Sequence, residues 1–549
     1  MANGEQTETV TCTIDGREVT VPKGSRIIEA AERIGVGIVH YCYHPALSAP
    51  AMCRMCLVEV EGAPKLQPAC VTTVADGAVI RTDAEQATEA RKGVLEFYLL
   101  NHPLDCPICD ASGECKLQDY VFQEGRKHGR SVEPKRILGL DDFGGDVLYD
   151  GDRCIMCTRC TRYMKEVAGD ERLCVVQRGD RSVIDTFFDE GLDRSPFASN
   201  IIDICPVGSL LSKDFLHKAR AWDLDRTPSV CPNCSQGCNI TLDTRDNLVQ
   251  RLKPRHNPDV NSYWMCDYGR YTYEWTNRGA VTLGGTASGT RLEEPMVRRS
   301  GRREAATWQD AIRTLVERLG TVDGQLTVVG SPYHGNEDNG LLRRLQEVVG
   351  GAAAVFRSPR ADDEVTLPGF PKLRRRRDLS ANARGLEAFG FRRVGADDGT
   401  GGLEAGGAVV VLGDAVADLP EDAFAGASLV VYLGTVDAPA MTGADFVLPV
   451  TSFAEQEGTF TNFEGRVQRY WPALNPPPQA RPAWQVLGVV LAGLDDGVAP
   501  ANAGSAFLRI AELYDAFGGL SYPQLGTRGA LLNEPVRIAA GAVGNGGQA

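Results

Sequence analysis

The alternation of apolar and polar residues at the start of the chain predicts a hairpin, a helix and further strands. Residues 9–21, TVTCTIDGREVTV, alternate around an Asp-Gly pair, which favours a tight hairpin turn. Ser25 then precedes RIIEAAERIG, a pattern that predicts a short amphipathic helix with Ser25 as its N-cap and Gly35 at its end. The runs LVEV and AVIRT predict two more strands, and residues 85–100 predict another amphipathic helix.

The pattern changes along the chain. From residue 150 to about 280 it is loop-rich, and after about residue 283 it becomes rich in Gly, Ala and Val. A helical pattern at 308–319 precedes three short apolar runs bounded by turn residues, QLTVVGS (325–331), AVVVLGD (408–414) and SLVVYLG (428–434). These runs are typical of an α/β region with a buried, mostly parallel sheet. No G-x-G-x-x-G follows them, so the sequence does not support a dinucleotide fingerprint. The basic run Arg374–Arg377 is predicted to be solvated.

Length and charge restrict the possible functions. A chain of 549 residues suggests roughly three to five domains. Its formal net charge of -14 argues against a nucleic-acid binder, which needs a basic surface. The longest apolar stretch, residues 484–494, is shorter than the roughly 20 residues that span a bilayer, so no transmembrane helix is expected. The polar start of the chain lacks the apolar core of a secretory signal.

The cysteines are unusual in number and place. All 17 lie between Cys12 and Cys266. A secreted disulfide protein would be small and would carry a signal peptide, whereas clustered thiols in a reducing compartment point to metal ligands.

The cysteines form four groups of four ligands when one histidine is included. The first group is spaced C-x10-C-x2-C-x13-C, the second H-x3-C-x2-C-x5-C, and the third and fourth each join a run of three cysteines to a remote one. The four sets are Cys42, Cys53, Cys56 and Cys70; His102, Cys106, Cys109 and Cys115; Cys154, Cys157, Cys160 and Cys205; and Cys231, Cys234, Cys238 and Cys266.

These spacings suit iron–sulfur clusters. The first set has the pattern, though not the intervals, of a plant-type ferredoxin, and C-x2-C-x2-C with a remote Cys-Pro is the bacterial [4Fe-4S] arrangement. Two-residue gaps let thiolates converge while backbone amides point at the sulfides. The alternative is structural zinc, which a single C-x2-C pair would favour. Three triple-cysteine runs and a ferredoxin-like loop favour iron and sulfide.

Three residues need separate interpretation. His102 lies four residues before a cysteine triplet that otherwise lacks a fourth ligand, and an imidazole in place of a thiolate should favour the reduced state of a cluster. A lone histidine is more often structural or exposed. Cys12 and Cys174 remain outside the sets, and each is predicted to be a small buried apolar residue.

The order of these motifs resembles one protein family. The segments YCYH…CRMC…C, NHPLDCPICDASGECKLQD, CIMCTRC…ICPVG and CPNCSQGC…MCDYGR are similar to the large iron–sulfur subunit of NADH-quinone oxidoreductase, respiratory complex I, which is the G subunit of the bacterial enzyme. The resemblance is strong over roughly residues 8–280. It continues weakly through residues 444–484, which are similar to the molybdopterin-oxidoreductase fold at the C-terminal end of that subunit.

The resemblance implies a multidomain α+β and α/β fold. Its expected domains are a plant-type ferredoxin-like [2Fe-2S] domain, a His/Cys-ligated [4Fe-4S] segment, a [4Fe-4S] ferredoxin-like domain, a fourth [4Fe-4S] domain and a degenerate, shortened molybdopterin-oxidoreductase-like α/β domain, over residues 8–84, 85–125, 145–225, 226–283 and 284–540.

The resemblance also implies the cofactors and the function. It implies one [2Fe-2S] and three [4Fe-4S] clusters, with His102 as a ligand of the second set, and no molybdopterin. The fourth cluster occurs in only some family members and lies off the main route. Electrons from NADH would enter from a flavin-binding partner subunit and leave towards quinone, and the whole complex would couple this to ion translocation through its membrane arm. The expected place is the cytoplasmic face of the inner (plasma) membrane, beside other peripheral-arm subunits, with no nucleic acid and no catalytic site in this chain.

Related enzymes offer an alternative function. NAD-linked formate dehydrogenases carry similar motifs ahead of a molybdenum domain, but a lysine follows the last cysteine of their fourth motif. Here Asp267 follows Cys266, and no later cysteine could ligate molybdenum. Iron hydrogenases need further cysteines in a catalytic domain, and none are present.

Overall fold

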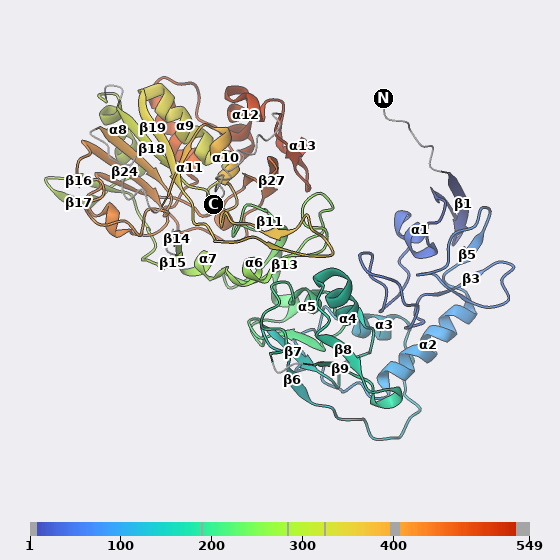
Figure 1. Ribbon diagram of the computed structural model, residues 1–549. Helices are drawn as coiled ribbons and strands as arrows, with labels where there is room; N and C mark the ends of the chain where they lie inside the picture. Colours follow the sequence, from blue (N-terminus) through green and yellow to red (C-terminus); the bar gives the residue numbers. More distant parts are fainter. Residues whose placement is uncertain (1–7, 188–189, 283–284, 323–324, 396–406, 534–549) are drawn as a thin grey trace, which may run out of the picture. The chain divides into compact units, whose positions relative to one another are not determined.

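The computed structural model describes residues 8–187, 190–282, 285–322, 325–395 and 407–533. The chain divides into two compact units, each of which is considered by itself (Figure 1). Unit 1 comprises Met1–Leu224 with Leu367–Pro371, and unit 2 comprises Asp225–Thr366 with Lys372–Ala549. The five expected domains stay a prediction, and the end of the last one, residues 534–540, lies outside the described residues.

Unit 1 begins with a five-stranded sheet in the order β2-β1-β5-β3-β4, packed against helix α1. The predicted hairpin is confirmed, because β1 and β2 pair up to Ile14 and Arg17 around two turn residues with φ of 49° and 79°. Positive φ at both positions is what a two-residue hairpin turn requires. The elements are β1 Thr9–Ile14, β2 Arg17–Pro22, α1 Ile27–Arg33, β3 Leu57–Val60, β4 Gln67–Pro68 and β5 Val79–Arg81.

The predicted N-cap of the first helix is wrong by one residue. The residue before the helix is Arg26, whose backbone N–H donates to Oε2 of Glu29 at 2.9 Å. The Ser25 carbonyl instead accepts from the N–H of Val74, and Arg26 forms a β-bridge to Thr73. The helix therefore begins only after this long-range pairing ends.

The rest of unit 1 surrounds the other cysteine-bearing loops. The predicted helix at 85–100 is confirmed as α2, and α3 lies beside it (Figure 1). Further on, a three-stranded sheet β10-β7-β6 and a hairpin β8-β9 flank two short helices. The elements are α2 Glu85–Leu99, α3 Lys116–Glu124, β6 Leu140–Asp142, β7 Val147–Asp150, α4 Arg159–Tyr163, the π-helix η1 Met164–Ala168, β8 Leu173–Val176, η2 Gly179–Arg181, β9 Val183–Thr186, α5 Asn200–Ile204, β10 Leu210–Ser212 and η3 Ala221–Asp223.

Unit 2 begins with a three-stranded antiparallel sheet, two short helices and a hairpin. These elements are β11 Asp225–Val230, β12 Asn239–Arg245, β13 Leu248–Pro254, α6 Asp267–Tyr271, α7 Glu274–Arg278, β14 Gly279–Thr282 and β15 Gly285–Ser288.

An eight-stranded sheet, β17-β16-β25-β24-β23-β18-β19-β22, forms the body of unit 2. The six strands from β25 to β22 are parallel, which confirms the predicted sheet, and β16 and β17 add an antiparallel edge. Leu326 and Val328 of β18 belong to the core shared with α8, α9, α11 and α12, whereas Val329 belongs to the core of the opposite face. Burial on both faces explains the continuous apolar runs.

The remaining elements of unit 2 form the eight-stranded sheet, the helices packed on it and the smaller sheets and turns around it. They are β16 Met296–Arg299, β17 Arg302–Ala305, α8 Trp308–Leu319, β18 Leu326–Gly330, α9 Asn336–Val349, β19 Gly351–Arg357, β20 Val365–Thr366, β21 Arg374–Arg375, α10 Ala383–Ala388, β22 Arg392–Val394, β23 Ala408–Leu412, β24 Leu429–Gly434, η4 Pro439–Met441, β25 Phe446–Pro449, η5 Phe453–Glu455, β26 Gly458–Thr461, β27 Arg466–Tyr470, α11 Ala483–Gly493, α12 Ala503–Leu513, η6 Asp515–Phe517, α13 Tyr522–Leu525 and β28 Ala530–Leu531.

Two side-chain predictions are corrected and one is confirmed. The basic run is not simply solvated, because the Arg375 and Arg376 side chains are only 14% and 13% exposed. The guanidinium carbon of Arg376 lies 3.5 Å from the centre of the Phe463 ring, on which it stacks. Cys174 is only half-buried, since it lies on the small β8-β9 hairpin, whereas Cys12 is buried as predicted. Among the described helices, none combines the length and apolar character needed to cross a bilayer.

Candidate metal centres

The first ligand set lies in unit 1, with three cysteines in the loop between α1 and β3 and the fourth just after β4. All four thiols are buried. The Cys42 thiol is hydrogen-bonded to those of Cys53 and Cys70, and these bonds hold the pKa of Cys42 well below its usual range. Cys56 is hydrogen-bonded to Cys70 in turn. The fold therefore brings all four predicted ligands together, although they are up to 28 positions apart in the sequence.

The second set contains the buried imidazole. Burial, with the nearby charge of Arg153, lowers the pKa of His102 to about 4, so the ring is neutral near pH 7. Its Nδ1 atom is buried, and among the residues that the structure describes it has no hydrogen-bond partner. A neutral imidazole is the form that binds a metal. Cys109 and Cys115 are buried while Cys106 is exposed, and burial raises the pKa of the Cys109 and Cys115 thiols, with the neighbouring cysteines of the set adding to the rise.

The third set is held by a loop of unusual backbone conformation. In CIMCTRC, Met156 and Thr158 have φ of 51° and 56°, although neither is glycine. The N–H of Met156 donates to Sγ of Cys154 at 3.4 Å. Alternating right- and left-handed residues turn successive N–H groups to one side and form a nest for an anion. Cys205 follows α5, and burial raises the pKa of its thiol to about 12, with the charge of Cys157 as the next cause.

The fourth set lies entirely in unit 2. Its four thiols are 3–4% exposed, and Sγ of Cys266 accepts the N–H of Gly269 at 3.3 Å as the N-cap of α6. A β-carbon on Gly269 would lie 3.1 Å from Sγ of Cys231 and 3.4 Å from that of Cys266. The absent side chain leaves room for the sulfur atoms. The Cys234 thiol also receives a backbone hydrogen bond from Arg376.

All four sets share features that suit a buried, negatively charged group. All 17 cysteines are free thiols. Each set has left-handed residues in its loop: Ala51 and Arg54; Gly113; Met156 and Thr158; and Gly237. Among the described residues, no three His, Cys, Asp or Glu side chains converge on a point that suits a single metal ion. The fit to clusters therefore rests on the loop conformations, the buried sulfur atoms and the unpartnered imidazole nitrogen.

Sequence reasoning missed three residues beside the third set. They are Arg159, Arg162 and Glu166, which are spaced i, i+3 and i+7, and the first of them lies inside the cysteine run. All three form hydrogen bonds with the loop that carries Cys42. The helical spacing of these polar residues was a signal, but it does not reveal what they contact.

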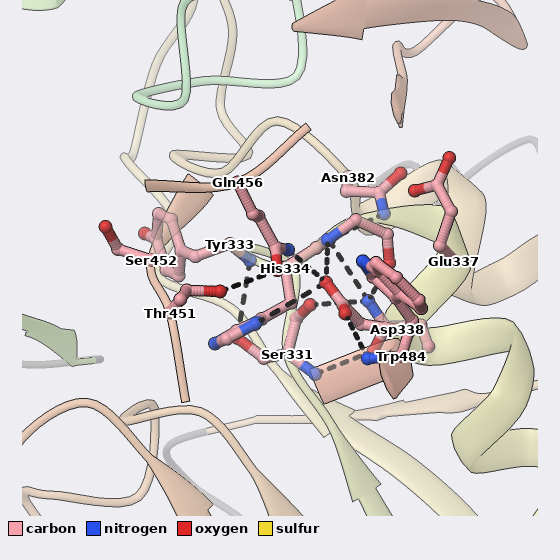
Figure 2. A network of polar contacts seen from close by, with 12 residues as sticks. Ser331, Tyr333, His334, Glu337, Asp338, Asn382, Thr451, Ser452, Gln456 and Trp484 are labelled. Atoms are coloured by element: carbon pink, nitrogen blue, oxygen red, sulfur yellow. Dashed lines mark hydrogen bonds and ion pairs between the residues drawn. The ribbon is translucent and has the colours of Figure 1, made fainter. Parts of the chain in front are cut away.

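A second region lies in unit 2, at the carboxyl ends of the parallel strands. Ligands of open α/β sheets bind where neighbouring strands lead in opposite directions, which here is between β18 and β23. Figure 2 shows that buried side chains fill the space beyond the end of β18. The Asp338 carboxylate accepts hydrogen bonds from Nε2 of Gln456 at 2.7 Å and from the N–H of Trp484 at 2.8 Å. It also lies 3.7 Å from Nδ1 of His334. The cavity beside this network is about 20 Å³, whereas small-molecule sites measure ~300–1,000 Å³.

Five family models match the chain in succession. They are described as 2Fe-2S iron-sulfur cluster binding domain, NADH-ubiquinone oxidoreductase-G iron-sulfur binding region, NADH-quinone oxidoreductase subunit 3 ferredoxin-like domain, Molybdopterin oxidoreductase Fe4S4 domain and Molybdopterin oxidoreductase, over residues 7–85, 91–130, 144–211, 224–278 and 414–492.

Curated proteins are similar over different lengths. The 78 kDa subunit of NADH-ubiquinone oxidoreductase from Candida albicans is 30% identical over 93% of this chain and 86% of the relative. The G subunit of NADH-quinone oxidoreductase from Rickettsia conorii is 39% identical over 56% of this chain, and the match spans 44% of that relative's length. Among solved structures, a chain of an NAD+-reducing [NiFe]-hydrogenase is 27% identical over 38% of this chain and 90% of that chain, with a TM-score of 0.34.

Proposed function

Because the chain belongs to the family of large iron–sulfur subunits of NADH-quinone oxidoreductase, we propose that it carries electrons between partner subunits of such an enzyme. Electrons from NADH enter from a flavin-binding partner subunit and leave towards quinone. Bound clusters supply the one-electron chemistry. The chain itself positions the ligands, excludes water from them and provides the surrounding charges and amide donors.

The observation that carries this proposal is the common construction of the four ligand sets. Each combines at least two buried sulfur atoms with at least one left-handed residue in its loop. We assign one [2Fe-2S] cluster to the first set and a [4Fe-4S] cluster to each of the others. The proposed ligands are Cys42, Cys53, Cys56 and Cys70; His102, Cys106, Cys109 and Cys115; Cys154, Cys157, Cys160 and Cys205; and Cys231, Cys234, Cys238 and Cys266.

The molybdopterin-like region is proposed to be a scaffold without that cofactor. The small cavity beyond β18 and the buried Asp338 network support this, because a pterin would need space that these side chains fill. The formate dehydrogenase alternative has no support beyond the shared molybdopterin oxidoreductase fold.

The assembly and its place are part of the proposal. The flavin- and NADH-binding subunit and other peripheral-arm subunits are the expected partners, and contact with the membrane arm is indirect. The expected place is the cytoplasmic face of the inner (plasma) membrane. Ion translocation belongs to the whole complex.

The testing experiment is metal and sulfide analysis of anaerobically purified protein, followed by low-temperature EPR of the dithionite-reduced form. The proposal expects about 14 iron atoms per chain with matching acid-labile sulfide, and one [2Fe-2S] and three [4Fe-4S] signals. Zinc without acid-labile sulfide would overturn it. Molybdenum near one atom per chain, with formate-dependent dye reduction, would favour the formate dehydrogenase alternative.

A further inference from the structure

One helical face connects the first ligand set to the third within unit 1. The segment formed by α4 and η1 begins inside the CIMCTRC run, and α5, which leads to Cys205, contacts α4 (Figure 1). Arg159, Arg162 and Glu166 project from this segment towards residues 42–48, the loop that begins with a ligand of the first set.

Arg162 bonds a ligand residue of each set with the same nitrogen atom. Its Nη2 donates to the carbonyl oxygen of Cys42 at 2.5 Å and to that of Cys157 at 3.3 Å. Its Nη1 donates to the carbonyl of Ser48. Glu166 secures the same residue, because its carboxylate accepts the N–H of Ser48 at 2.9 Å and the hydroxyl at 2.5 Å. The two loops are therefore fixed to each other close to their sulfur ligands.

Arg159 makes a parallel connection from the interior. It is 4% exposed, its Nη1 donates to the carbonyl of Ile204 at 3.1 Å, and its Nη2 donates to the carbonyl of Tyr43. Ile204 precedes Cys205 of the third set, and Tyr43 follows Cys42 of the first. One guanidinium thus bridges the neighbours of two predicted ligands.

The charge of Arg159 also needs an explanation. A buried guanidinium is costly unless an opposite charge compensates it. Among the described residues, its hydrogen-bond acceptors are backbone carbonyls and no carboxylate pairs with it. Arg159 lies between Cys157 and Cys160 in the chain, and its side chain bonds to the neighbours of Cys205 and Cys42. A cluster held by these cysteines would be the anion that this cation faces.

We propose that Arg159 and Arg162 are positioning residues for electron transfer between the first and third ligand sets. They fix the separation of the two sets and place positive charge beside both. This inference rests on the proposed function, because it requires clusters in the two sets. A cation next to a cluster stabilises the form that has gained an electron, so it raises the reduction potential.

The test uses the full chain with its clusters and combines redox titration followed by EPR with the magnetic interaction between the two reduced centres. Arg159→Gln should move the reduction equilibrium of the third set's cluster at least tenfold towards the oxidised form, which is about 59 mV for one electron. Arg159→Lys keeps the charge but loses the planar fork, so it should retain most of the potential. Arg162→Gln should weaken the magnetic interaction. Arg181→Gln, at an exposed position of η2, is the matched control and should change neither measurement.

The outcomes separate this inference from the proposed function. If the unmodified chain holds no clusters, the proposed function fails first. If it holds both clusters, and Arg159→Gln and Arg162→Gln leave the potentials and the interaction unchanged, the positioning role is overturned while the proposed function stands. If Arg159→Gln does not assemble its clusters, the Arg162→Gln variant tests the inference instead. An unchanged magnetic interaction between the two reduced centres in Arg162→Gln would also overturn the positioning role.

Discussion

Gly208 and Cys109 meet where the second and third ligand sets come together: a β-carbon built on Gly208 would lie only 2.1 Å from Sγ of Cys109. Gly208 follows Cys205 by three residues, so it belongs to the loop of the third set, whereas Cys109 belongs to the second. The missing side chain allows the two predicted centres to approach.

We expect Gly208→Ala to disturb the second set. The added methyl group must displace either the Cys109 sulfur or the backbone of residues 205–208, and overpacking of this kind costs about 1–3 kcal/mol. Iron content should fall by about four atoms per chain, with loss of one [4Fe-4S] EPR signal. Gly93→Ala is the control, because a β-carbon on Gly93 meets no atom of the described residues within 4 Å. Normal iron content in Gly208→Ala would contradict the prediction.

We expect His102→Cys to keep a cluster but to lower its reduction potential. A thiolate adds negative charge where the structure has a neutral imidazole with an unpartnered buried Nδ1, and negative charge disfavours reduction. EPR-monitored redox titration measures the shift, which should affect one centre only. His128→Cys, at an exposed position further along the chain, should leave every potential unchanged. Unchanged potentials in His102→Cys would refute ligation by this histidine.

The order of apolar, polar and turn residues correctly predicted elements that are uniformly buried or that have a distinctive turn. All five residues of β18 are buried, because helices cover one face of the sheet and loop segments the other, and this produces an unbroken apolar run. The first hairpin was equally visible, because its Asp-Gly turn needs positive φ at both residues. The grouping of the first four cysteines also followed from spacing.

Contacts between distant segments could not be predicted. Arg376 was expected to be solvated, but it stacks on Phe463, 87 positions away, and lies beside Cys234. Arg159 reads as an ordinary charged residue between two cysteines, yet its partners are a carbonyl 116 residues away and another 45 residues away. The helical spacing of the sequence could show which face of α4 Arg159 occupies. Only the three-dimensional fold shows which segments that face contacts.

We expect loss of the fourth cluster to leave electron flow unchanged. The first three sets lie in unit 1, whereas the fourth lies wholly in unit 2. Cys234→Ala should remove one [4Fe-4S] signal and about four iron atoms per chain, while NADH-dependent quinone reduction by the assembled complex stays the same. Cys157→Ala, in the third set, is the comparison that should abolish the activity. A large loss of activity in Cys234→Ala with the other three signals intact would place the fourth set on the electron path.

We expect the stability of unit 2 to fall as the pH rises towards 8 because of Glu337. This side chain is fully buried, and burial raises its pKa from 4.5 to about 8. It accepts hydrogen bonds from the N–H and hydroxyl of Thr459 and the hydroxyl of Tyr522, and the charge of the adjacent Asp338 also raises its pKa. Since the folded form holds the proton more tightly, its contribution is complete below about pH 4.5 and is lost as the pH rises through about 8.

Glu337→Gln imitates the protonated acid and should remove this dependence. At pH 9 the variant should be more stable than the unmodified chain by on the order of 2–4 kcal/mol, whereas the two should be similar at pH 5. Tryptophan fluorescence during urea unfolding measures this, because five of the six tryptophans belong to unit 2. Glu347→Gln, an exposed position on the same helix, should leave the pH dependence in place. If the unmodified chain is equally stable at pH 6 and pH 8.5, Glu337 does not hold a proton in the folded state.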